Sequence, residues 1–165
     1  MTIRVREQLA GFPAQSDAVL TTNAISGLIG LTRDGRITSD TVLRVDLGTI
    51  ASDEPRRDNY VKQETLRVSE YPDAQVTVTG THGLPQPLPA SGEWKFTLVT
   101  AMTVHGTSHE VSWDVTGQRV GRELRATART TVHFGDFGLE RPSVAAVLSV
   151  QDEIHLEVLL RAVQG

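Results

Sequence analysis

The chain has 165 residues, a formal net charge of −4 at neutral pH and no cysteine. Its length predicts a single domain over residues 1–165, large enough to bury a core without covalent cross-links. The acidic balance is the wrong sign for nucleic-acid binding, so no nucleic-acid partner is expected. The lack of cysteine excludes disulfides, thiolate metal sites and a cysteine nucleophile.

No apolar run approaches the roughly 18 residues of a transmembrane segment, and none is predicted. Residues 1–12 carry charges where a signal peptide needs its apolar stretch, so the chain as it stands is expected to be soluble. A signal or anchor removed from a longer precursor would leave the same sequence, and the compartment is therefore left open.

The first part of the chain alternates apolar and polar residues in short stretches. Weak alternation over 3–9 predicts a first strand, whereas 15–18 is predicted to be loop. Within 21–31, Gly27 and Gly30 interrupt an apolar stretch. Glycine inside a strand marks a bulge or a bend, and bends are needed where a sheet curls into a barrel.

A turn at 33–36 leads into a clear strand within 38–50, where Leu43, Val45 and Leu47 recur at every second position. This spacing predicts that the three side chains share one face of a sheet.

The alternation breaks over 51–72. Ser52 or Asp53 is predicted to cap a helix that has Pro55 in its first turn. One or two short helices are therefore expected as an excursion around 53–70. Their predicted inward residues are Tyr60, Val61 and Leu66.

The strongest signal lies at 94–116, where two alternating stretches flank His105 and Gly106. Apolar residues recur at every second position on both sides of this break, which predicts two strands. Gly106 can supply the positive φ of a tight reversal, so the segment is predicted to be one long β-hairpin. Both Trp94 and Trp113 then fall on its apolar face.

The remaining segments supply further predicted strands. Residues 73–79 form one, before a proline-rich loop. A turn is predicted at 117–121, a strand at 122–134, a loop at 139–146 and a long closing strand at 147–163.

About eight strands joined mostly by turns predict an all-β fold, either an antiparallel sandwich or a barrel. The barrel is preferred because several strands are about ten residues or longer, above the usual five or six. The inward face of the 122–134 strand also carries Ala126 and Ala128, which leave room that a sandwich core would fill. The sequence therefore predicts an internal cavity.

Short motifs in a fixed order carry a family resemblance over about residues 9–162. The motifs are Asp46-Leu47, Ser52, Arg57-Asp58, Tyr71-Pro72, the hairpin 102–107 (MTVHGT), Phe137-Gly138 and 150–154 (VQDEI). Together they resemble the centre and the closing segments of the YceI-like family. The chain departs from the family pattern where Leu66-Arg67-Val68 replaces a Phe-Phe pair and where Met102 replaces a leucine.

The resemblance implies an eight-stranded, up-and-down, lipocalin-like barrel that encloses a long amphiphile. Polyisoprenoid lipids and fatty-acid derivatives are the ligand types it implies. It also implies a periplasmic or extracellular location, no cofactor and no enzymatic activity.

The residues predicted to line the cavity are the apolar ones on the inward faces of the predicted strands. They are Leu43, Val45, Leu47, Val76, Val78, Trp94, Phe96, Leu98, Met102, Val111, Trp113, Val115, Leu124, Ala126, Ala128, Leu156, Val158 and Leu160. Plain core packing is the alternative for Trp94, Phe96 and Trp113, and the small residues opposite them favour cavity lining.

Arg57 and Asp58 are the polar pair that the sequence singles out. They are predicted either to contact a ligand headgroup or to form a structural salt bridge that pins the helical excursion to the barrel rim.

No metal site or catalytic site is predicted. His105 and His109 are four residues apart across a turn, which suits turn residues better than metal ligands. Ser108, His109 and Asp114 form no triad by local geometry, and no oxyanion loop is apparent.

Two functions of different classes follow. In the first, the protein carries or sequesters a long-chain lipid, because each buried CH2 contributes about 0.8 kcal/mol and no specific contact is needed. In the second, the barrel is filled and its outer surface serves as an interaction or stress-response module of the cell envelope. An enzyme ranks third. The predicted partner is a long-chain lipid, isoprenoid by resemblance, and a homodimer is left open.

Overall fold

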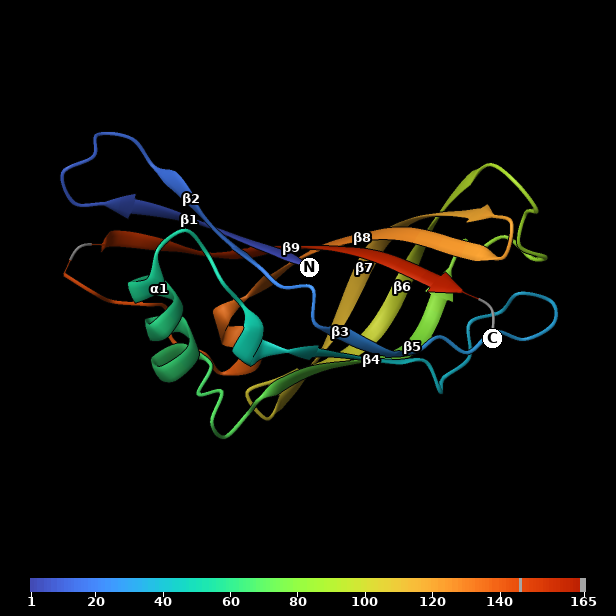
Figure 1. The fold of residues 1–165 in the computed structure, drawn as a ribbon, viewed down its shortest axis with the longest axis horizontal. Coiled ribbons are helices and arrows are strands. Elements are labelled where there is room, and N and C mark those ends of the chain that lie inside the picture. Colours follow the sequence, from blue (N-terminus) through green and yellow to red (C-terminus); the bar gives the residue numbers. More distant parts are fainter. Residues whose placement is uncertain (146, 164–165) are drawn as a thin grey trace.

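The computed structural model describes residues 1–145 and 147–163, and one antiparallel sheet dominates it (Figure 1). Within those residues nine strands cross the sheet in the order β2-β1-β9-β8-β7-β6-β5-β4-β3. The strands are β1 (Thr2–Leu9), β2 (Ser16–Thr21), β3 (Ile25–Leu28), β4 (Val42–Asp46), β5 (Asp73–His82), β6 (Glu93–Val104), β7 (Thr107–Val120), β8 (Glu123–His133) and β9 (Val147–Val163). The sheet curls into a half-barrel with β2 and β3 as its edges, which confirms the predicted antiparallel, lipocalin-like architecture.

The structure has nine strands where the sequence predicted eight, because β2 begins in the stretch at 15–18 that was predicted to be loop. β2 pairs with β1 along its whole length. Its only buried residues are Ala18 and Leu20. Two inward side chains, one of them an alanine, give too short an alternation to reveal a strand.

β6 and β7 form the predicted hairpin. Their register places Leu98 opposite Trp113, so the apolar side chains of both strands share one face. The reversal lies at His105 and Gly106, which have φ values of 50° and 73°. Both residues are therefore in the left-handed region that tight turns use.

A polar residue, Thr100, is fully buried on that face of β6. The indole Nε1–H of Trp113 donates to the Thr100 hydroxyl at 3.0 Å, and this hydroxyl donates to the carbonyl oxygen of Val111 at 3.1 Å. Both polar groups are satisfied inside the apolar wall, and the two bonds fix the orientation of the indole.

The turn predicted at 117–121 begins later than expected, because β7 continues to Val120 and the reversal uses Gly121, with φ 62°. Gly117 lies buried within the strand, where an added Cβ would come within 3.0 Å of the Trp94 indole. A residue without a side chain is therefore needed there to make room for Trp94.

The predicted helical excursion is present, with one correction at its start. The excursion consists of α1 (Pro55–Tyr60) and the π-helical turn η2 (Val61–Thr65). Two short 3-10 turns, η1 (Leu47–Thr49) and η3 (Phe134–Phe137), lie outside it. Pro55 occupies the first turn of α1 as predicted, but the capping residue is Glu54 rather than Ser52 or Asp53. The Glu54 carboxylate accepts a hydrogen bond from the Arg56 N–H at 3.1 Å.

No helix among the described residues has the length and the apolar character that crossing a membrane requires.

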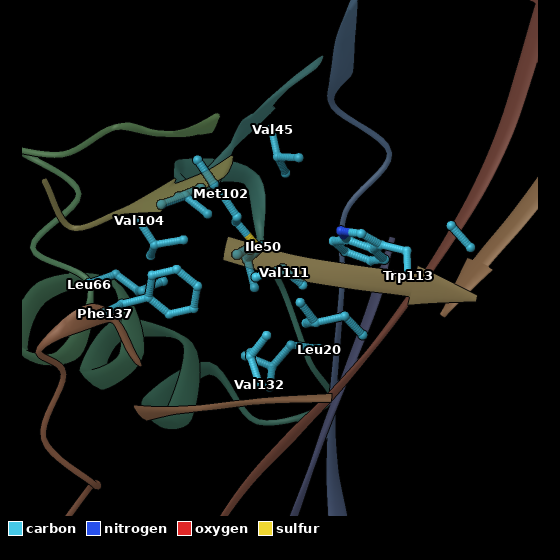
Figure 2. Close-up of a cluster of buried hydrophobic side chains, with 14 of the residues drawn as sticks. Leu20, Val45, Ile50, Leu66, Met102, Val104, Val111, Trp113, Val132 and Phe137 are labelled. Carbon is cyan, nitrogen blue, oxygen red and sulfur yellow. The ribbon is translucent and has the colours of Figure 1, made fainter. Parts of the chain in front are cut away.

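The sheet and the helical elements share one buried apolar cluster, much of which Figure 2 shows. Ile50, Leu66 and Phe137 come from the chain outside the strands, and they join Met102 and Val104 of β6. The helical elements therefore complete the core that the half-barrel leaves open.

Candidate functional site

A cavity of about 870 Å³ lies on the inner face of the curled sheet. Its wall consists mostly of apolar side chains, contributed by strands at both ends of the chain, such as Val5 of β1 and Leu156 of β9. Alternate residues of a strand face the same side, so a strand such as β1 or β9 supplies several wall residues, whereas β7 supplies only Trp113. The volume lies in the upper part of the range of about 300–1,000 Å³ that is usual for small-molecule sites.

The structure places many of the predicted lining residues around this cavity. Those on its wall are Leu43, Val45, Leu47, Val76, Leu98, Met102, Trp113, Ala128, Leu156, Val158 and Leu160. Those that do not contribute to its wall are Val78, Trp94, Phe96, Val111, Val115, Leu124 and Ala126. Trp94 packs across Gly117, which pairs with Ala126 in the ladder between β7 and β8. The Trp94 indole therefore covers Gly117 on that part of the sheet's inner face.

Further wall residues come from β1, β2, η3, the loop that follows η3 and the start of β9. They include Ile3, Val5, Leu9, Ala18, Leu20, Phe134, Phe137, Leu139, Val144, Val147 and Val150. The wall residues of β1 could be predicted, since they occupy every second position of the strand predicted at 3–9. The same periodicity places a charged residue, Glu7, on the inward face.

Glu7 is the most buried carboxylate of the cavity wall, with 7% of its surface exposed. It lies between Val5 and Leu9 on the inner face of β1. A carboxylate in an apolar wall is costly unless it is paired. Its partner is Arg57 of α1, whose Nη2 lies 2.9 Å from the Glu7 Oε1 atom.

Arg57 therefore joins α1 to β1 across the wall. Its Nη1 also lies 2.8 Å from the Asp53 Oδ1 atom and donates to the Ser52 hydroxyl at 3.4 Å. The guanidinium is thus shared by two carboxylates, one buried and one at the surface.

Arg57 and Asp58 do not pair with each other; the salt bridge that joins the helical excursion to the sheet is the one between Arg57 and Glu7. The Asp58 carboxylate instead accepts from the backbone N–H of Ser52 at 2.8 Å and from its hydroxyl at 2.7 Å. Asp58 fixes the chain entering α1, which also explains why Ser52 does not cap the helix. Glu7 lies fifty positions from Arg57, so local spacing gave no sign of this partner.

The cavity reaches solvent beside α1 and the tip of the β1–β2 hairpin. Asp53, Glu54 and Arg56 contribute to its lining and are exposed on the α1 side. Phe12 and Val144 contribute to its lining and are exposed on the other side. The mouth therefore has one charged side and one apolar side.

The histidines singled out in the hairpin lie outside the cavity wall. The His105 ring packs against Tyr71, and the His109 ring meets Phe137 edge-on with ring centroids 6.1 Å apart. Among the described residues, no group of three or more His, Asp or Glu side chains is arranged to hold a metal ion.

Comparisons with solved structures show the same fold in other proteins. The Campylobacter jejuni YceI protein matches with a TM-score of 0.74 and 16% identity, over 96% of this chain and 94% of that one. A polyisoprenoid-binding domain from Saccharophagus degradans, implicated in plant cell wall breakdown, matches with a TM-score of 0.70 and 13% identity, over 97% and 91%. Burkholderia cenocepacia BcnA matches with a TM-score of 0.70 and 14% identity, over 98% and 95%.

No curated protein matches this chain by sequence. The model of the YceI-like domain matches residues 4–162, which is nearly the whole chain and covers every strand of the cavity wall. The chain therefore belongs to the YceI-like domain family.

Proposed function

We propose that this protein binds a long-chain amphiphilic lipid, of polyisoprenoid or fatty-acid type, inside the cavity. The observation that carries the proposal is the cavity itself, which has an apolar wall of strand residues and charged side chains gathered at its mouth and beside α1. This layout matches a ligand with one long apolar part and one polar end.

The apolar part of such a ligand supplies the binding free energy. Each methylene moved from water into an apolar wall contributes about 0.8 kcal/mol, so a long chain binds without any specific contact. Leu43, Met102 and Leu156 come from three different strands of this wall. We propose that they and the other predicted residues on the wall contact the chain of the lipid.

The polar end would lie at the mouth, because burying an unpaired polar group costs several kcal/mol. Arg57 is engaged by Glu7 and Asp53, whereas the neighbouring Arg56 is exposed at the same mouth. We propose that Arg56 is the cation more readily available to an anionic headgroup, while Arg57 keeps α1 in place.

A binding role is proposed in preference to catalysis, together with a role in sequestering or carrying the lipid in the cell envelope. Family membership supports binding, and the similarly folded Saccharophagus degradans domain is itself a polyisoprenoid-binding domain.

The test is extraction of the purified protein with organic solvent, followed by mass spectrometry of the extract. A stoichiometric long-chain lipid is expected. An empty extract, with no uptake of polyprenol or fatty-acid probes by the purified protein, would favour the alternative in which the outer surface is used.

A further inference from the structure

Two segments beside the cavity mouth, 8–16 and 142–151, carry no charged residue, although Glu140 and Arg141 immediately precede the second one. The sequence has no Asp, Glu, Lys or Arg between Glu7 and Asp17, and none between Arg141 and Asp152, although such residues make up 22% of the chain. Segments at a water-facing surface are usually polar, so two neighbouring segments without a charge indicate a different environment there.

The two segments are neighbours in the fold. Leu9 at the end of β1 pairs with Val147 at the start of β9. Beyond this pair the Phe12 N–H donates to the Leu9 carbonyl oxygen at 3.3 Å, and the Val147 N–H donates to the Val144 carbonyl oxygen at 2.9 Å. Phe12 and Val144 therefore lie at the same end of the two paired strands.

Large apolar side chains are exposed at this end. Phe12 and Leu148 are 65% and 67% exposed, and Val144 is exposed as well. We call these three residues the mouth patch. Phe12 and Val144 also line the cavity, so the exposed patch is continuous with the cavity wall.

The opposite side of the mouth has the reverse character. Asp53, Glu54 and Arg56 beside α1 are exposed and charged, and they line the same cavity. An apolar patch next to a charged rim is the layout of proteins that lie at a membrane interface, with the apolar part in the acyl region and the charges among headgroups.

We infer that the protein docks on the surface of a lipid bilayer through the mouth patch, so that the cavity opens directly against the membrane. This inference rests on the proposed lipid-binding function. A lipid that crossed water to reach the cavity would expose its whole apolar chain to water, which is unfavourable for every CH2. Contact between the mouth and the bilayer removes that barrier.

A second copy of this chain is the other occupant that would cover the patch. Two copies meeting there would seal the mouth, whose lining includes Phe12 and Val144. A bilayer covers the same residues and leaves the passage for the lipid open, which favours the bilayer.

The experiment is flotation with phosphatidylcholine vesicles that carry no net charge. Two leucines of β9 offer a matched pair, because Leu148 at the mouth and Leu159 nearer the other end of the strand are both 67% exposed. Leu148→Asp should reduce the vesicle-bound to free ratio about tenfold or more, since a buried leucine is worth about 1.5–3 kcal/mol. Leu159→Asp should bind as the unchanged protein does, and Phe12→Ser should repeat the Leu148→Asp result.

Two controls show whether the flotation result reports apolar contact between the mouth patch and the bilayer: binding at high salt and uptake of a lipid probe. Binding should persist at 0.5 M salt, where exposed charges are screened to within about 3–10 Å. Leu148 does not line the cavity, so Leu148→Asp should bind a soluble fluorescent lipid probe with unchanged affinity in the absence of vesicles.

Several results would overturn the inference. The first is equal vesicle binding by Leu148→Asp and Leu159→Asp. The second is binding that requires anionic lipid and disappears in salt. The third is a protein that does not float and forms a dimer, which Leu148→Asp dissociates. Uptake of the probe by a protein that never floats would refute docking and leave the proposed function standing. Flotation without any uptake of the probe would refute the proposed function alone.

Discussion

Tyr71 lies against His105, with ring centroids 4.5 Å apart and ring planes tilted by 54°. Tyr71 precedes β5, and His105 forms the turn between β6 and β7. The His105 Nε2 atom is buried without a hydrogen-bond partner among the described residues, so packing against the tyrosine accounts for its position. The Tyr-Pro and His-Gly motifs that carried the family resemblance thus contact each other directly in the fold.

Gly106 is the residue that permits this contact, and Gly106→Ala should destabilise the protein. The substitution forces an alanine to φ 73° and places its Cβ 2.9 Å from the Tyr71 Cε1 atom. The φ alone costs about 1–2 kcal/mol, and the contact adds to it. Urea unfolding measures the loss. Gly121→Ala is the control, since φ there is 62° but no atom of the described residues lies within 4 Å of the added Cβ. Equal losses at both glycines would show that the Tyr71 contact has no energetic role.

The neighbouring arginines Arg56 and Arg57 should behave differently on substitution. Arg57→Met leaves Glu7 buried and unpaired, so the free energy of unfolding should fall by about 2 kcal/mol or more. Arg56→Met should leave stability within about 0.5 kcal/mol, because Arg56 is exposed. Thermal and urea unfolding of both variants check this.

Lipid binding by the same two variants distinguishes an arginine that contacts the ligand from one that only stabilises the fold. Arg56→Met should weaken the binding of a lipid phosphate more than that of the corresponding alcohol. The double variant Glu7→Gln, Arg57→Met should regain stability relative to Arg57→Met alone, because no charge is left buried. If Arg57→Met keeps full stability and loses only phosphate binding, Arg57 is the headgroup contact and its structural role is wrong.

Ala128 should be the sensitive position of the alanine strand. It lines the cavity, so Ala128→Phe should fill part of the space and abolish uptake of a fluorescent lipid probe while circular dichroism shows a folded protein. A void accepts added volume that a packed core resists. Ala126 is on the same strand but does not line this cavity. Ala126→Phe should therefore retain uptake if it folds, and loss of folding by Ala128→Phe would indicate a filled interior.

Glu123 gives a pH-dependent prediction away from the cavity. Hydrogen bonds from Arg161 and then Arg125 lower the pKa of the Glu123 carboxyl from 4.5 to about 2. A carboxyl with a lowered folded-state pKa stabilises the protein above its ordinary pKa, and this contribution is lost as the pH falls from 4.5 through about 2. NMR titration of Glu123 should show the low pKa, and Arg161→Gln should raise it. An unchanged pKa in that variant would mean that the ion pair does not hold in solution.

The sequence predicted the β-hairpin and the inward faces of the strands because side-chain alternation depends only on local geometry. It could not predict how far along the half-barrel each side chain lies. Trp94 and Met102 share an inward face of β6, yet only Met102 lines the cavity. The curl of the whole sheet decides this, and no single strand encodes it.

The charged part of the site was harder to predict for a related reason. Glu7 had the right periodicity to face inward, but its charge interrupted the apolar pattern on which strand prediction depends. Its pairing with Arg57 joins the first strand to the helical excursion. Such a contact depends on tertiary structure, so the sequence could not show which carboxylate pairs with Arg57.

The central claim is that the cavity binds the apolar chain of a lipid, and a chain-length series tests it most directly. The Kd of saturated fatty alcohols of increasing length should be measured on delipidated protein by displacement of a fluorescent probe. Each added CH2 should lower the Kd about fourfold, since about 0.8 kcal/mol is gained per methylene, until the cavity of about 870 Å³ is filled and the Kd levels off. A Kd that does not depend on chain length, or a series in which no alcohol displaces the probe, would contradict the account.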